Sequence, residues 1–173
     1  MANEFFMEMA LAQAKIAFAR GEFPVGCVIV QEKEVIATGV RQGTNLGEPF
    51  FSEIDHAEIR ALKSLEANAQ AFIPERSVVF CTMEPCLMCF AAIILAGIKK
   101  IVYAYEDPMG GGTCCDLSSM TPLYKDVKIE VVSGVLREKS LDLFCKFFNK
   151  ETNLYWKNSF LEAYTLDQKK IVD

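Results

Sequence analysis

The sequence is poor in histidine, because His56 is the only one among 173 residues. Any chemistry that needs an imidazole must therefore use this side chain, and sites built from several histidines are excluded. Basic residues are also in the minority: 18 Lys and Arg stand against 23 Asp and Glu, which gives a net charge of −5. Nucleic-acid-binding proteins usually carry a basic surface, so this charge weighs against a polyanionic partner.

Long apolar runs are missing as well. The longest covers ten residues from Cys89 to Ile98, short of the ~18 residues of a membrane span. Glu4 and Glu8 stand where a signal peptide would begin with basic residues. We therefore expect no membrane segment and a cytoplasmic location, where thiols stay reduced. The seven cysteines are an odd number, so we interpret Cys86-x-x-Cys89 as a metal-binding pair and not a disulfide.

The apolar pattern predicts helices that alternate with strands. Helices are expected over residues 3–20, from an N-cap at Asp55 to Asn68, and from Pro85 to Gly97. Strands are expected over residues 26–31, 34–40, 77–82, 101–105 and 128–133, the first two joined as a hairpin by residues 32–33. Residues 106–127 are expected to form a loop with one short helix, and two further helices are expected near residues 141–148 and 156–163.

This order of elements predicts an α/β fold, a three-layer α-β-α sandwich with one mixed five-stranded sheet. The length corresponds to about one domain. We assign residues 1–149 to that domain and residues 150–173 to a C-terminal helical extension packed on it.

Two motifs carry chemistry. His56-Ala57-Glu58 is followed, 30 positions after His56, by Cys86 in Pro85-Cys86-x-x-Cys89. A catalytic zinc ion takes three protein ligands and leaves one position for water, and His56, Cys86 and Cys89 supply three ligands. The cysteines stand at a predicted helix start, where their sulfurs share one face and the helix dipole stabilises thiolates. Glu58 is left free to move protons.

This combination of motifs is the signature of zinc-dependent deaminases. Between about residues 5 and 148 the chain resembles the cytidine/deoxycytidylate deaminase superfamily, and within it the TadA-like branch of tRNA adenosine deaminases and guanine deaminases. The resemblance rests on the two metal motifs and on residues 24–26, 35–39, 82–84, 98–103, 134–136 and 143–148. It implies a cytidine deaminase-like fold, one Zn²⁺ per subunit and a homodimer.

The implied reaction is the hydrolytic removal of the exocyclic amine of a nucleobase, which releases ammonia. Glu58 would take a proton from water, pass it to the ring nitrogen beside the attacked carbon, and then protonate the departing amine. Residues in or beside the motifs are the expected substrate contacts, namely Arg41, Ala57, Thr82, Glu84, Pro85 and Phe148.

Two candidate substrates stay open. The overall likeness points to adenosine in tRNA, which would be converted to inosine. In tRNA adenosine deaminases an Asn shortly after the second-strand Gly holds the target base, whereas Arg41 and Gln42 stand at this place here. This departure, the acidic net charge and the neutral segment 150–173 favour a free base or nucleoside such as guanine, cytosine or cytidine, used in nucleotide salvage.

A non-enzymatic alternative is a structural zinc-binding interaction module. It needs a fourth protein ligand, which could come from Cys27, Cys81, Cys114, Cys115 or Cys145. In that case Glu58 would serve only as the capping-box partner of Asp55.

Several aromatic and cysteine pairs have more than one reading. The pair Phe50-Phe51 suits base stacking, core packing or a dimer contact, and Trp156 is expected in the core. The pair Cys114-Cys115 suits either a loop over the pocket or a surface loop.

Overall fold

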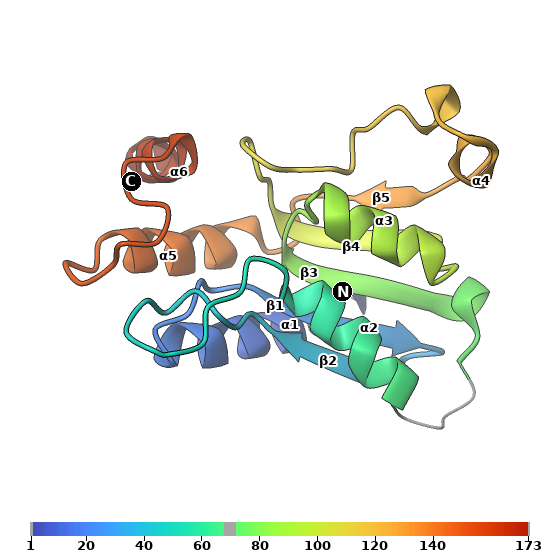
Figure 1. Ribbon diagram of the computed structural model, residues 1–173, viewed down its shortest axis with the longest axis horizontal. Coiled ribbons are helices and arrows are strands. Elements are labelled where there is room, and N and C mark those ends of the chain that lie inside the picture. Colours follow the sequence, from blue (N-terminus) through green and yellow to red (C-terminus); the bar gives the residue numbers. More distant parts are fainter. Residues whose placement is uncertain (1, 68–71, 173) are drawn as a thin grey trace.

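The chain folds around a five-stranded sheet with strand order β2-β1-β3-β4-β5 (Figure 1). The computed structural model describes residues 2–67 and 72–172. The strands are β1 (Gly26–Gln31), β2 (Glu34–Val40), β3 (Ser77–Met83), β4 (Lys100–Tyr105) and β5 (Glu130–Val132). The helices are α1 (Ala2–Ala19), α2 (Ala57–Ala67), α3 (Leu87–Leu95), α4 (Pro122–Lys125), α5 (Arg137–Phe148) and α6 (Phe160–Val172). Two short 3₁₀ turns cover Pro74–Arg76 and Leu117–Ser119.

The sheet is mixed, as the sequence predicts. Strand β1 is antiparallel to both β2 and β3, whereas β3, β4 and β5 run parallel to one another. The β1–β2 hairpin has the predicted bounds, and its turn residues Glu32 and Lys33 both have positive φ, at 52° and 76°. Two central residues with positive φ match the twist of a two-residue hairpin. The start of β1 and the ends of β2, β3 and β4 therefore meet at one edge of the sheet.

Side chains alternate between the two faces of the sheet and build the three predicted layers. Cys27 and Ile29 of β1 belong to the core under α2 and α3, whereas Val28 and Val30 pack with α1. Helix α5 lies beside α1, and α6 packs on α5 (Figure 1). Gly39 on β2 allows α2 to approach closely, because a Cβ there would lie 1.8 Å from the Ala57 carbonyl oxygen.

Helix α2 begins at Ala57, so the prediction of Asp55 as its N-cap is wrong. The His56 carbonyl accepts the hydrogen bond of the Arg60 N–H, which makes His56 the capping residue. The Asp55 carboxylate instead lies 3.8 Å from Arg60 and 4.0 Å from Lys63. The predicted helix end at Asn68 lies outside the described residues.

The second helix start also differs from the prediction. Helix α3 begins at Leu87 and not at Pro85, because Cys86 is held in an extended conformation by a β-bridge to Gly111. The predicted end is confirmed: the helix stops at Leu95, and Gly97 follows with φ +81°, a conformation that favours glycine. The loop before β5 forms one 3₁₀ turn as well as the short helix α4, and β5 is shorter than predicted.

The C-terminal segment is anchored to the body of the molecule. The Tyr105 hydroxyl lies 3.1 Å from the Thr165 hydroxyl, and Tyr164 donates to Glu106 at 2.9 Å. On α5, Asp142 accepts from Lys169 at 2.7 Å. Among the described helices, each is too short or too polar to cross a lipid bilayer.

Candidate active site

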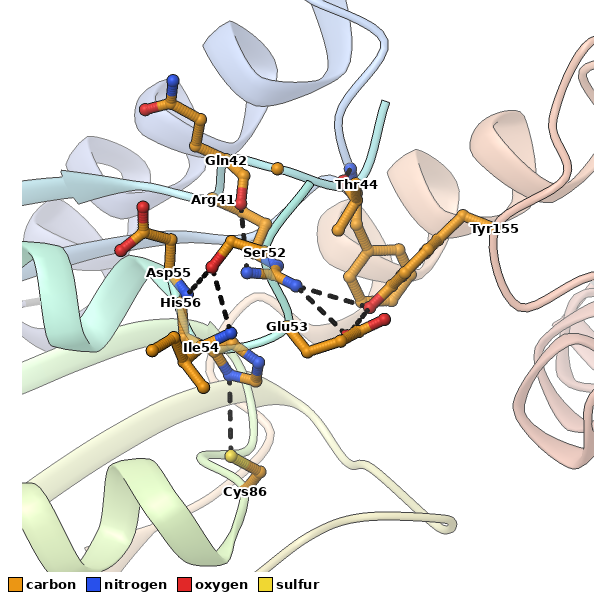
Figure 2. Close-up of polar contacts among 12 residues, drawn as sticks. Arg41, Gln42, Thr44, Ser52, Glu53, Ile54, Asp55, His56, Cys86 and Tyr155 are labelled. Atoms are coloured by element: carbon orange, nitrogen blue, oxygen red, sulfur yellow. Dashed lines mark hydrogen bonds and ion pairs between the residues drawn. The ribbon is translucent and has the colours of Figure 1, made fainter. Parts of the chain in front are cut away.

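Three metal-binding side chains meet where α2 and α3 begin. His56 directly precedes α2, Cys86 caps α3, and Cys89 lies in the first turn of α3. His56 Nδ1 lies 3.5 Å from the Cys86 sulfur and 3.4 Å from the Cys89 sulfur, and Figure 2 shows the first of these contacts. The N-termini of two helices therefore point at one cluster.

The cluster has the dimensions of a zinc site. Zn–N and Zn–S bonds of about 2.0 and 2.3 Å in a tetrahedron place the nitrogen and a sulfur about 3.5 Å apart, which agrees with both distances. Within the described residues, this group of three ligands lacks a fourth His, Cys, Asp or Glu. The other cysteines lie elsewhere: Cys27, Cys81 and Cys145 are buried in the core, and Cys114 and Cys115 are exposed. The arrangement therefore disfavours a closed structural site.

The three side chains influence one another's pKa values. A hydrogen bond from the Cys89 thiol and the contact with His56 lower the pKa of Cys86 to about 4, although burial opposes them. The same pairing, together with burial, raises the pKa of Cys89. Burial works against protonated His56, but the Cys86 sulfur and the Glu58 charge outweigh it and raise the pKa of the imidazole. A divalent cation bound here would favour the deprotonated thiols and the neutral imidazole, which are the forms that bind metal.

Glu58 is a buried carboxylic acid beside the metal-binding group. It is the second residue of α2, and its side chain is 3% exposed. Within the described part of the chain, its Oε2 atom is buried without a hydrogen-bond partner. Burial raises its pKa, and the nearby imidazole of His56 only partly offsets the rise. An unpaired buried polar atom costs about 1–3 kcal/mol, so its retention here indicates a role toward a ligand.

A pocket of about 420 Å³ opens over this cluster. It lies at the sheet edge where the carboxyl ends of the parallel strands meet, the usual ligand position in α/β sheets. Five of the predicted site residues line it: Arg41, His56, Glu58, Glu84 and Cys86. Cys89 is fully buried beneath them.

Four predicted substrate contacts do not line this pocket. Ala57 is fully buried in the core, and Phe148 packs against Phe23 with ring centroids 6.2 Å apart. The Thr82 hydroxyl accepts from the Gly26 N–H at 3.0 Å. The Pro85 carbonyl accepts a backbone hydrogen bond at 2.9 Å from residue 112. Each of the four therefore supports the frame around the site.

Most of the residues that line the pocket away from the metal-binding group were not predicted from the sequence. The additional lining residues are Phe23, Val25, Glu53, Met83, Asp107, Met109, Gly110, Tyr155, Trp156 and Leu161. Trp156 lines the pocket and is 42% exposed, so its prediction as a core residue is wrong. No spacing in the sequence links this residue to the metal motifs, since its position depends on how the C-terminal segment folds back.

The structure narrows the alternatives for the pairs Phe50-Phe51 and Cys114-Cys115. Phe50 and Phe51 are 47% and 55% exposed, which excludes core packing in this chain. Thr113 donates to the Glu84 carboxylate through its hydroxyl at 2.5 Å and its N–H at 3.3 Å. These bonds draw the loop after β4 toward the pocket, and Cys114 and Cys115 follow on its exposed side.

Arg41 occupies the opposite side of the pocket, directly after β2. Its guanidinium donates to the Gln42 carbonyl at 3.1 Å and to the Tyr155 hydroxyl at 3.4 Å. The nearest Glu53 oxygen lies 3.6 Å from the guanidinium, and Tyr155 donates its own hydroxyl hydrogen to that oxygen at 2.9 Å. Figure 2 shows the three side chains converging above His56.

Fold and site together define a deaminase of the zinc-dependent type. The chain belongs to the family described as the cytidine and deoxycytidylate deaminase zinc-binding region, whose profile matches residues 1–105. This membership confirms the predicted family and the predicted class of enzyme, a hydrolytic nucleobase or nucleoside deaminase.

The chain is similar to proteins named as tRNA-specific adenosine deaminases. The chain is 31% identical to the tRNA-specific adenosine deaminase of Aquifex aeolicus (strain VF5), over 88% of this chain and 98% of that one. It is 33% identical to the tRNA-specific adenosine deaminase of Bacillus subtilis (strain 168), over 86% and 89%. A solved structure described under "A-to-I Editing by tRNA:A34 Deaminases" matches 80% of this chain and 98% of its own, with 32% identity and a TM-score of 0.64.

Proposed function

We propose that this protein deaminates a nucleobase with Glu58 as its proton carrier and with one Zn²⁺ per subunit held by His56, Cys86 and Cys89. The observation that carries the proposal is the buried, unpaired Oε2 of Glu58, which lies in the pocket beside the three ligand atoms. An acid–base group needs this combination of access to substrate and freedom from other partners.

The residues present account for the proton transfers. A zinc ion in such a site supplies an acidified water molecule. Glu58 accepts a proton from the water and delivers it to the ring nitrogen beside the carbon that bears the amine. It then takes the hydroxyl proton of the tetrahedral intermediate and gives it to the departing amine, so that one water is consumed, a carbonyl replaces the amine and ammonia leaves. Burial raises the pKa of Glu58 above the usual carboxyl value, which makes the protonated form easier to reach and suits the donating half of this exchange.

The names of the relatives support adenosine in tRNA as the first candidate substrate. A free base or nucleoside such as guanine, cytosine or cytidine is the second candidate, and it is favoured by charge. The chain carries a net charge of −5. The pocket wall also presents four carboxyl groups, those of Glu53, Glu58, Glu84 and Asp107, against the single guanidinium of Arg41.

Ammonia release by the zinc-loaded protein tests the proposal. The substrates would be free bases, nucleosides, mononucleotides and bulk tRNA, with Glu58→Ala as the blank. Release above the blank from tRNA alone would select the first candidate, and release from small molecules would select the second. Failure to release ammonia from every member of the set, with zinc bound, would contradict the proposed function.

We also propose a homodimer in the cytoplasm. An apolar groove between α2 and α3 supports a partner contact, since its lining consists mainly of Ile59, Leu62, Leu65, Phe72, Ala92, Leu95 and Ala96. Light scattering on the purified protein tests the subunit number, and a mass equal to one chain would contradict the dimer.

A further inference from the structure

The Arg41 guanidinium is a buried charge whose hydrogen bonds go to neutral oxygens. The residue is 2% exposed, and within residues 2–67 and 72–172 its hydrogen bonds go to the Gln42 carbonyl and the Tyr155 hydroxyl. The Glu53 carboxylate lies 3.6 Å away, beyond the range of a good N–H···O bond. Burying a charge is costly unless it is well paired, and a guanidinium has five N–H donors. Arg41 therefore retains donor capacity at the wall of the pocket.

Tyr155 and Glu53 hold this guanidinium in place. The Tyr155 hydroxyl accepts from Arg41 and donates to Glu53, so it bridges the two charged groups. Tyr155 comes from the segment between α5 and α6, 114 positions away from Arg41. The C-terminal segment thus builds part of the pocket and determines where the guanidinium points.

We propose that Arg41 binds the substrate by donating hydrogen bonds to a neutral acceptor on its base, and that Tyr155 and Glu53 are the positioning residues. The inference rests on the proposed function, since it concerns the same pocket. A phosphate is disfavoured at this position, because four carboxyl groups share the lining with the single guanidinium. The group that accepts from Arg41 must therefore be uncharged, and any phosphate of the substrate must lie outside the pocket.

Two kinds of base present such an acceptor. Adenine offers ring nitrogens, whereas guanine and cytosine also offer a carbonyl oxygen. Both kinds of base can accept a hydrogen bond from Arg41. Titration with adenosine, guanosine and cytidine shows whether the acceptor is a ring nitrogen or a carbonyl oxygen. A preference of at least about tenfold for guanosine or cytidine, lost in Arg41→Met, would identify the carbonyl oxygen.

The protein contains its own reporter for this test. Trp156 is the only tryptophan of the chain, it lines the pocket, and its ring centroid lies 5.7 Å from that of Tyr155. Quenching of tryptophan fluorescence on titration therefore reports binding directly. A zinc-loaded Glu58→Gln background prevents turnover, so binding is measured separately from catalysis.

Tyr155→Phe and Tyr164→Phe form a matched pair of variants. Each removes one hydroxyl that donates to a carboxylate at 2.9 Å, but Tyr164 bonds to Glu106 and does not line the pocket. We expect Tyr155→Phe to weaken nucleoside binding about tenfold and Arg41→Met to weaken it about 10- to 100-fold, in line with the loss of hydrogen bonds to a charged group. Tyr164→Phe should bind as the parent does.

The results separate the inference from the proposed function. Equal affinities of Tyr155→Phe and Tyr164→Phe would overturn the positioning role, and tighter binding of a 5′-mononucleotide that depends on Arg41 would overturn the neutral acceptor. With Glu58 intact, Tyr155→Phe should raise KM and leave kcat nearly unchanged. If the parent protein released no ammonia yet bound nucleosides through Arg41, the proposed function would fail and this inference would stand.

Discussion

Replacing Glu58 with Gln should separate catalysis from folding. The substitution keeps the size of the side chain and removes its ability to carry a proton. Acid–base catalysis by one positioned group is worth about 10²–10⁴-fold, so we expect kcat to fall by that factor. At about 1.36 kcal/mol per tenfold, the loss corresponds to about 2.7–5.4 kcal/mol of activation free energy.

The loss of activity in Glu58→Gln should not be accompanied by a loss of stability. The Oε2 atom of Glu58 is buried without a partner in the described part of the chain, and such an atom costs about 1–3 kcal/mol. An amide at this position carries no charge and is less costly to bury. We therefore expect the free energy of unfolding of Glu58→Gln to equal or exceed that of the parent.

Three measurements check this reasoning: ammonia release, bound zinc and thermal unfolding. Zinc content should be unchanged, because the metal-binding group consists of His56, Cys86 and Cys89. Glu75→Gln is the control, since Glu75 is an exposed glutamate that lines neither the active-site pocket nor the groove between α2 and α3. Activity of Glu58→Gln within tenfold of the control, or a loss of zinc, would refute the assigned role.

Three further predictions concern the frame of the site. Cys89→Ser should lower bound zinc from about one ion per chain to a small fraction, as metal analysis would show, and full occupancy would remove Cys89 from the ligand set. Burial alone would raise the pKa of Glu22, but hydrogen bonds from the hydroxyl and N–H of Thr44 and from two neighbouring amides outweigh it and lower the pKa. The stabilisation from Glu22 is therefore complete above its usual pKa and is lost as the pH falls through the lower folded value. Glu22→Gln should cost about 1–3 kcal/mol at neutral pH, and denaturant titrations should show the difference closing as the pH falls below the usual carboxyl pKa; a constant difference would contradict this. Gly39→Ala places a Cβ 1.8 Å from a carbonyl oxygen of α2, so we expect a loss of about 1–3 kcal/mol in thermal unfolding, and an unchanged melting temperature would contradict the close approach.

The metal centre could be predicted from the sequence because its geometry is local. Cys86 and Cys89 are three residues apart at a helix start, and one His with a Glu two positions later leaves few alternative ligands. The first two strands could also be predicted from the sequence. The apolar β-branched runs and the short turn between them gave the bounds of β1 and β2 that the structure shows. Such signals depend on neighbours along the chain, so a single sequence contains them.

The start of α3 and the pocket lining around Arg41 depend on contacts between residues that are far apart in the sequence. Cys86 is kept out of α3 by its bridge to Gly111, which no helix propensity can report. Arg41 meets Tyr155 across 114 positions, and Glu53 meets Tyr155 across 102. The zinc-binding motifs and the family could therefore be predicted from neighbouring residues along the chain. Which other side chains line the pocket depends on where the C-terminal segment packs, and this follows from tertiary contacts alone.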